Sequence, residues 1–243
     1  MRAPGGLARG RAGTLALALA AALALKAFHA SAGAEAHGWL LAPTAWLVGL
    51  VSGRRFEPEP GIGWLSREAG LVIAPACAGV NHLVIAFCTL VLGFAPSSPR
   101  PGRRARFLAG AALLAYAATL VANATRIALG IALPEPAWLP AEQAHRLEGV
   151  AVHLGSLWLL AFAAARGAGR AGPFRAALLP LLVYLAVTLA LPLANGAHAR
   201  PEFWEHARVV VLASLGLLAL VLAGVAASRR RSELRAEHLR ERE

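Results

Sequence analysis

The chain has 243 residues, of which 58% are hydrophobic and 15% are charged, and its mean hydropathy is +0.57. A water-soluble domain of this length seldom reaches such values, so the composition excludes an ordinary soluble protein and indicates membrane helices. The formal net charge of +11 comes almost wholly from arginines in short gaps between apolar runs, since Lys26 is the one lysine among 24 basic residues. This distribution is typical of cytoplasmic loops and argues against a nucleic-acid partner.

The N-terminal part of the chain contains two apolar segments of different kinds. A basic head at 1–13 precedes the apolar run 14–30, which is either an uncleaved first span or a signal peptide with the processing-like sequence "ASA" at 30–32. The next run, 39–53, is short and contains Pro43, and a polar loop rich in proline and glycine follows it.

Longer apolar runs fill most of the remaining sequence, and a charged segment follows them. We expect one membrane domain over 1–243, with a transmembrane bundle at 14–227 and a charged cytoplasmic tail at 228–243. The longer runs lie at about 71–95, 107–133, 147–165, 174–193 and 208–227.

The arginines predict the orientation of the chain. They cluster in the head, around 100–106, at 166–175 and in the tail, which should all be cytoplasmic. A fully spanning 39–53 segment would place 96–106 outside, so we expect this short segment to be re-entrant or interfacial. The prediction is an all-α helical membrane bundle of about six full spans, with both termini inside and with 54–74, 134–146 and 194–207 outside.

A cysteine in an unusual setting opens the 71–95 run, within the sequence "APACAGVNH" at 74–82. Pro75 suits the first turn of a helix, where a missing N–H costs nothing. Cys77 would then lie in that turn, near the positive end of the helix dipole, which favours the nucleophilic thiolate. Free backbone N–H groups of the same turn could hold an oxyanion. Gly79 would allow close approach of another backbone or a substrate. The alternative is a small buried residue, which is our interpretation of Cys88.

An arginine interrupts the next apolar run, in the sequence "NATRIALGIAL". A charge on an apolar helix costs roughly 3 kcal/mol at the bilayer centre, so Arg126 should face a polar cavity or a partner. Snorkelling to the outer headgroups is the alternative. Asn123 lies three residues earlier on the same helix face and could orient the guanidinium.

A histidine begins the fifth span, in "EQAHRLEGV". His145 could accept a thiol proton and later donate it to a leaving amine, although a lone interfacial histidine often has no role. Glu142 and Glu148, each three residues away, could hold its ring or solvate the helix end. His153 lies deeper on a similar face and is the reserve candidate.

Two neighbours of Cys77 complete the candidate set. On a continuous helix, Asn81 would point with Cys77 and serve as a supporting residue, whereas His82 would point elsewhere. The eleven residues between Cys77 and Cys88 would span about 16 Å of helix, beyond disulfide reach. No Cys/His spacing indicates a zinc or haem site, so we expect neither metal nor cofactor.

Three motifs occur in order on successive spans: Pro-x-Cys-x-Gly at 75–79, Asn-x-x-Arg at 123–126 and His-x-x-x-Gly, ending at Gly149. Together they resemble the exosortase/archaeosortase family, and their surroundings are similar to the exosortase K branch. The resemblance covers roughly 40–195. Many members carry Ser or Thr after the motif cysteine, whereas this chain has Ala78, which removes a possible hydroxyl donor near the thiol.

The resemblance implies a sortase-like cysteine peptidase and transpeptidase in the cytoplasmic (inner) membrane, with its site facing the periplasm or the cell exterior. Cys77 would attack a peptide bond in the C-terminal sorting signal of an exported protein, which combines a short motif, a membrane helix and a basic end. His145 would act as base and then acid, and Arg126 would stabilise the oxyanion. The resulting thioester would pass to an amine-bearing acceptor in the cell envelope.

Two other classes of function remain open on the residues alone. In a transporter or channel component, Arg126 would bind an anionic solute and Cys77 would be incidental. In a structural subunit, none of the three candidate residues would matter beyond stability.

Overall fold

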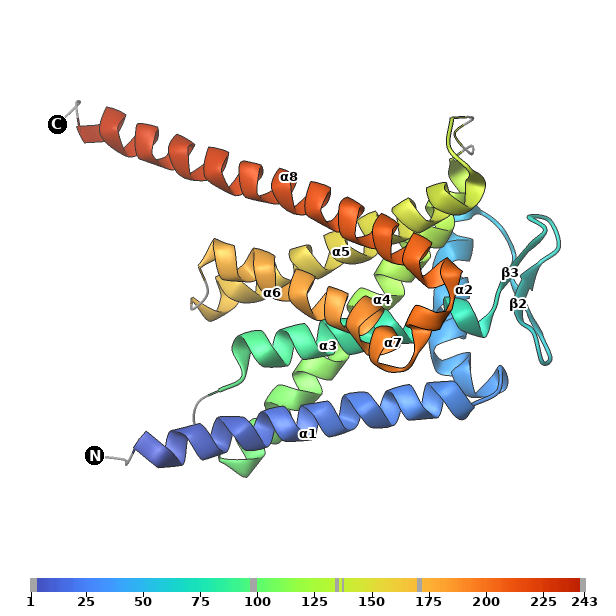
Figure 1. Ribbon diagram of the computed structural model, residues 1–243, viewed down its shortest axis with the longest axis horizontal. Coiled ribbons are helices and arrows are strands. Elements are labelled where there is room, and N and C mark those ends of the chain that lie inside the picture. Colours follow the sequence, from blue (N-terminus) through green and yellow to red (C-terminus); the bar gives the residue numbers. More distant parts are fainter. Residues whose placement is uncertain (1–3, 97–99, 134–135, 137, 170–171, 241–243) are drawn as a thin grey trace.

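The protein is an all-α, polytopic membrane bundle, described here by a computed structural model that covers residues 4–96, 100–133, 136, 138–169 and 172–240 (Figure 1). Six helical stretches in this part of the chain are long and apolar enough to cross a membrane, as the sequence predicted. They are Gly10–Ser31, Pro75–Phe94, Pro101–Ala132, Ala141–Gly167, Pro173–Ala194 and Pro201–Ser228.

The α-helices cover most of these stretches and include one further helix, α2, and the last of them continues beyond Ser228. They are α1 (Pro4–Ser31), α2 (Gly38–Ser52), α3 (Val80–Phe94), α4 (Pro101–Ala132), α5 (Ala141–Ala168), α6 (Pro173–Leu185), α7 (Leu191–Ala194) and α8 (Pro201–Arg240). A π-helical stretch, Ala186–Ala190, joins α6 to α7 within one span.

Helix α3 lies at the centre of the bundle and packs against α1, α4, α5 and α6. Its span is 56% buried, whereas that of α8 is only 11% buried. The outer helices expose leucines that are suited to face lipid, because the bilayer is as apolar as the side chains themselves. The central position of α3 means that residues at its start are surrounded by other helices.

Helix α2 is too short to cross the membrane. Its 15 residues rise about 22 Å, less than the roughly 30 Å of the hydrocarbon core. It runs steeply across the direction of α1 and packs against α4, where the Tyr116 hydroxyl donates a hydrogen bond of 2.7 Å to the Trp39 carbonyl (Figure 1). This geometry fits the expected re-entrant or interfacial segment.

The segment after α2 is folded, although the sequence predicted only a polar loop. Strands β1 (Glu57–Glu59), β2 (Gly63–Ser66) and β3 (Leu71–Ile73) form an antiparallel sheet in the order β1-β2-β3. Gly61 and Gly70 adopt positive φ in the two connections, a conformation that glycine takes without strain. Strands of three or four residues, one of them containing Pro58, carry too little alternation to be recognised from sequence.

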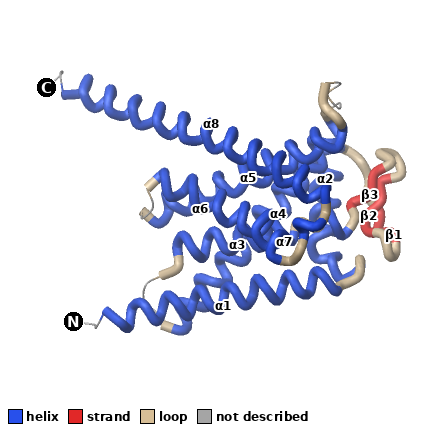
Figure 2. Tube along the Cα trace, in the orientation of Figure 1, coloured by secondary structure: helices blue, strands red, loops and turns tan. Residues whose placement is uncertain are grey.

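The two ends of the bundle differ in chemistry. The start of α1, the far end of α8 and the starts of α4 and α6 lie at one end, and the sheet lies at the other (Figures 1 and 2). The sheet segment 54–73 contains three arginines and three glutamates, whereas arginines outnumber acidic residues at the starts of α4 and α6.

Cysteine labelling tests how these two ends face the membrane. In a background with Cys77→Ala and Cys88→Ala, Ile62→Cys in the β1–β2 turn should react with an impermeant thiol reagent added outside intact cells. Arg103→Cys, at the start of α4, should react only after the cytoplasmic face is opened, because basic loops stay inside. Labelling of both positions from the same side would contradict this orientation.

Candidate functional site

The three residues singled out as catalytic candidates meet at the sheet end of the bundle. Cys77 precedes α3, Arg126 lies near the end of α4 and His145 lies near the start of α5. All three line a cavity of about 420 Å³ between the helices, which we call the bundle cavity. They also line a cavity of about 560 Å³ beside β3, which we call the strand cavity. The three side chains therefore lie on the boundary between two cavities.

Cys77 does not lie in the first turn of α3, contrary to the prediction. Pro75–Cys77 forms a separate single turn of 3₁₀ helix, and Gly79, with φ of 73°, separates it from α3. The backbone N–H of Cys77 donates to the Ala74 carbonyl at 2.8 Å, and that of Ala78 donates to the Pro75 carbonyl at 3.0 Å. Because these two N–H groups are already paired, they do not serve as the free donors that the predicted backbone oxyanion hole requires.

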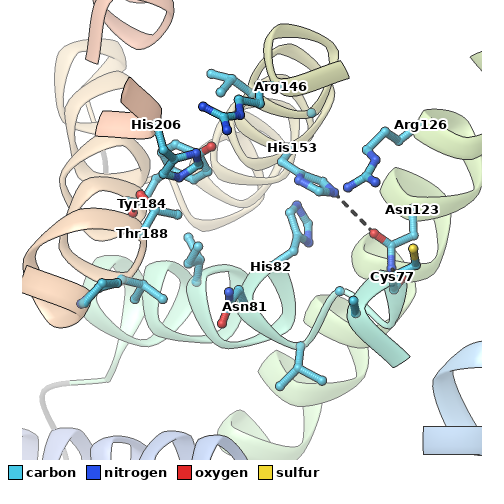
Figure 3. A pocket seen from close by; sticks show the side chains of 18 of the residues that line it. Cys77, Asn81, His82, Asn123, Arg126, Arg146, His153, Tyr184, Thr188 and His206 are labelled. Atoms are coloured by element: carbon cyan, nitrogen blue, oxygen red, sulfur yellow. Dashed lines mark hydrogen bonds between the residues drawn. The ribbon is translucent and has the colours of Figure 1, made fainter. Parts of the chain in front are cut away.

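Asn123 fixes the Cys77 turn from the neighbouring helix. Its Nδ2 donates a hydrogen bond of 3.1 Å to the Cys77 carbonyl, and its Oδ1 accepts one of 3.2 Å from His153 Nε2 (Figure 3). A Cβ at Gly79 would overlap with this amide. The sequence suggested that Asn123 orients Arg126, but the amide contacts the cysteine turn instead.

Arg126 and His145 are in direct contact. Arg126 Nη2 donates a hydrogen bond of 3.0 Å to His145 Nε2, and His145 Nδ1 lies 3.8 Å from a carboxylate oxygen of Glu148. Since Nε2 accepts this bond, a neutral His145 ring carries its proton on Nδ1, which faces Glu148. Gly149 lies against the aliphatic part of the Arg126 side chain. Glu142 instead forms an ion pair with Arg146.

No hydrogen bond in the described part of the chain joins the Cys77 thiol to Arg126 or His145. The thiol is partly exposed and lies on the same cavity wall as the guanidinium (Figure 3). The site thus brings together a free thiol and an arginine–histidine pair, with space between them for a substrate group.

Asn81 and His82, at the start of α3, both line the bundle cavity together with Cys77. Asn81 accepts a hydrogen bond of 2.6 Å from Lys26 of α1. His82 is buried, contacts Thr119 and Ser156, and lies with its ring centroid 5.0 Å from that of His153. Because Gly79 interrupts the helix, Cys77 does not share the phase of α3, and helical spacing from Cys77 does not separate Asn81 from His82.

Ala78 occupies the position where many members of the resembled family carry Ser or Thr. Its side chain is fully buried among apolar residues that include Leu40 and Val84. A hydroxyl at this position would point into that cluster and not into either cavity, so the loss of Ser or Thr here removes no donor from the cavity wall.

Several lining residues of the bundle cavity were not singled out from sequence as parts of a site. Lys26 and Arg146 add positive charge, and Tyr184 and Thr188 add hydroxyl groups on the α6–π segment. The described lining residues include no Asp or Glu. Glu142 pairs with Arg146 and Glu148 lies beside His145, so carboxylates next to the lining offset part of this positive charge. The π-helical stretch that carries Thr188 is a local signal of function, but it is visible only in the structure.

Cys88 lies outside the site, and the described residues form no group that could hold a metal ion. Cys77 and Cys88 are both free thiols, and Cys88 packs partly buried against the apolar core. Within the described residues, no group of three or more His, Cys, Asp or Glu side chains is placed to hold a metal ion.

The contact between Gly79 and Asn123 predicts different costs for two similar mutations. Gly79 and Gly70 both have positive φ, but only Gly79 lies against another side chain. Gly70→Ala should cost about 1 kcal/mol for the backbone conformation alone. Gly79→Ala should cost more, because Asn123 must move away from the Cys77 carbonyl. Thermal unfolding in detergent measures both, and equal losses would contradict the assigned packing.

The chain was compared with known proteins at three levels. No protein-family model, no curated protein and no solved structure matches it.

Proposed function

We propose that this protein is a membrane-embedded cysteine peptidase and transpeptidase of the exosortase type. The observation that supports it is the placement of Cys77, Arg126 and His145, from three separate segments, on the walls of the same two cavities. A nucleophile, a cation for the oxyanion and a base are the parts that acyl transfer requires. Their position at the end of the bundle away from the basic segments suits a substrate that has crossed the membrane.

The reaction would begin with transfer of the Cys77 thiol proton to His145. The thiolate then attacks the carbonyl carbon of a peptide bond, and the resulting oxyanion accepts hydrogen bonds from Arg126. Collapse of this intermediate breaks the C–N bond, and the leaving amine takes the proton from His145. An amine of the acceptor then attacks the thioester, forms a new amide and returns the thiol to Cys77; attack by water would give hydrolysis.

The hydrogen bond between Arg126 and His145 gives the two residues a shared role. His145 Nε2 has a single lone pair, and in the resting state Arg126 occupies it. His145 can accept a proton at Nε2 only after the guanidinium turns toward the substrate. Binding of the carbonyl by Arg126 would therefore release the base at the moment when the thiol needs it.

The proposed substrate is an exported protein with a C-terminal sorting signal, and the acceptor is an amine-bearing component of the envelope. A membrane helix in that signal could lie beside the bundle within the bilayer, while its basic end stays with the arginine-rich segments. The protein would thus reside in the inner membrane with its site on the periplasmic or outer side.

Paired cysteine variants test the nucleophile. The assay is cleavage of a co-expressed exported protein that ends in a short motif, an apolar helix and an arginine cluster, encoded near this gene. Cys77→Ala should abolish cleavage, Cys77→Ser should nearly do so, and Arg126→Ala should lower the rate by about 10²- to 10³-fold. Cys88→Ala is the matched control and should cleave normally, because this thiol packs in the core.

A second class of function has some support, because Lys26 and Arg126 line the bundle cavity and would bind an anionic solute there. In a transporter, Cys77→Ala would keep full function while Arg126→Ala would lose it. That outcome would reject the peptidase proposal.

The role of His145 can be separated from its contact with Arg126. In His145→Gln, the amide oxygen can still accept a hydrogen bond from Arg126, but the side chain cannot accept a proton. We expect kcat to fall by about 10²- to 10⁴-fold with little change in KM. Steady-state cleavage in detergent measures both constants. An unchanged kcat would assign the base to another residue.

A further inference from the structure

The strand cavity lies along the free edge of the sheet. β3 supplies Leu71, Val72 and Ile73 to its wall, and the opposite wall is formed by α4. β2 supplies none of the described lining residues, so the cavity lies on the side of β3 away from its partner strand. Among the described residues no other strand pairs with β3. An edge strand without a partner presents backbone donors and acceptors to whatever fills the adjoining space.

The register of the sheet identifies which backbone groups face outward. Pro58 lies opposite Trp64, and because proline has no N–H, Trp64 cannot exchange both hydrogen bonds with β1. Trp64 therefore directs its N–H and C=O toward Ile73 of β3. By alternation Leu71 also faces β2, and the N–H and C=O of Val72 point to the open edge.

Helix α4 supplies apolar residues to the strand cavity. These are Ile127, Gly130 and Ile131, and Arg54 and Glu68 also line the cavity. The candidate catalytic residues Cys77 and Arg126 line the same cavity. A molecule bound in the strand cavity would therefore contact the free edge of β3, apolar residues of α4 and the thiol of Cys77.

We propose that the strand cavity binds an extended segment of the substrate polypeptide as a fourth strand on β3. The segment exchanges two backbone hydrogen bonds with Val72 and lies between β3 and α4, which places a peptide carbonyl beside Cys77. Strand addition is a common mode of peptide recognition, in which backbone pairing provides affinity for many sequences. This assignment rests on the proposed function, because it assumes that Cys77 acts on a peptide.

A thiol-directed peptide tests the assignment on the full-length Cys88→Ala protein in detergent. The probe is acetyl-Val-Ala-Val-Ala acyloxymethyl ketone, whose methylene carbon is attacked by the thiolate with release of a carboxylate and formation of a thioether. The reference is the same ketone without the peptide. Intact-mass spectrometry follows the rate of alkylation. We expect the peptide to react about tenfold faster than the reference, the effect of two backbone hydrogen bonds.

N-methylated peptides and two Val72 variants test whether the peptide binds by strand addition. N-methylation of the peptide residue opposite Val72 should remove the rate gain, whereas methylation of its neighbours should leave the gain intact, since only alternate residues face β3. Val72→Pro should lose the gain, and Val72→Ala, which keeps the N–H, should retain it. The methylated peptides test the wild-type edge even where a proline variant is poorly folded.

The outcomes separate this assignment from the proposed function. Equal rates for peptide and reference, or a gain that is insensitive to methylation at every position, would reject strand addition while leaving Cys77 as nucleophile. No alkylation of Cys77 by either ketone would reject the proposed function itself. A methylation effect that alternates along the peptide supports both.

Discussion

The geometry of the candidate site depends on one buried amide, that of Asn123. Its two ends hold the carbonyl of Cys77 and the ring of His153, so a single side chain of α4 links the cysteine turn to α5. The amide fits because residue 79 has no Cβ. An unpaired buried amide would cost about 1–3 kcal/mol, and here both ends are satisfied. The asparagine thus stabilises a turn that the sequence of the turn alone would not determine.

In this arrangement the cysteine turn and α3 are two distinct elements joined at Gly79. Gly79 ends one and begins the other, and α3 then continues as the most buried helix of the bundle. His82 in its first turn is anchored to α4 and α5 by Thr119 and Ser156. The turn carrying Cys77 is therefore attached to a rigid support at its end, while its thiol stays partly exposed.

The sequence predicted the membrane spans and the position of the candidate site, but not the features that depend on the interruption of the helix at Gly79 or on very short strands. Six spans, the short α2 and the clustering of Cys77, Arg126 and His145 at one end follow from hydropathy, arginine positions and depth along each helix. The placement of His82 on the same cavity as Cys77 and Asn81 was not predicted, because helical periodicity was extended across a glycine that interrupts the helix. The sheet was missed, since its strands are too short to show a period of two.

Contacts between distant segments could not be predicted from spacing at all. The hydrogen bond from Lys26 to Asn81 joins α1 to α3, and the bond from Asn123 crosses from α4 to the Cys77 turn. Each depends on which faces of two helices meet, and a hydropathy pattern defines a depth in the membrane but not a rotation about the helix axis. The functional roles of these residues stay proposals.

The position of the thiol between two cavities has a consequence for the order of events in the proposed chemistry. An acyl chain bound to Cys77 would fill one of the two cavities and leave the sulfur accessible from the other. The incoming nucleophile could then arrive through that second cavity without waiting for the first to empty, so that the two halves of a turnover use separate entrances. The residues that select the acceptor amine would then differ from those that select the peptide substrate, because each reactant would bind in its own cavity.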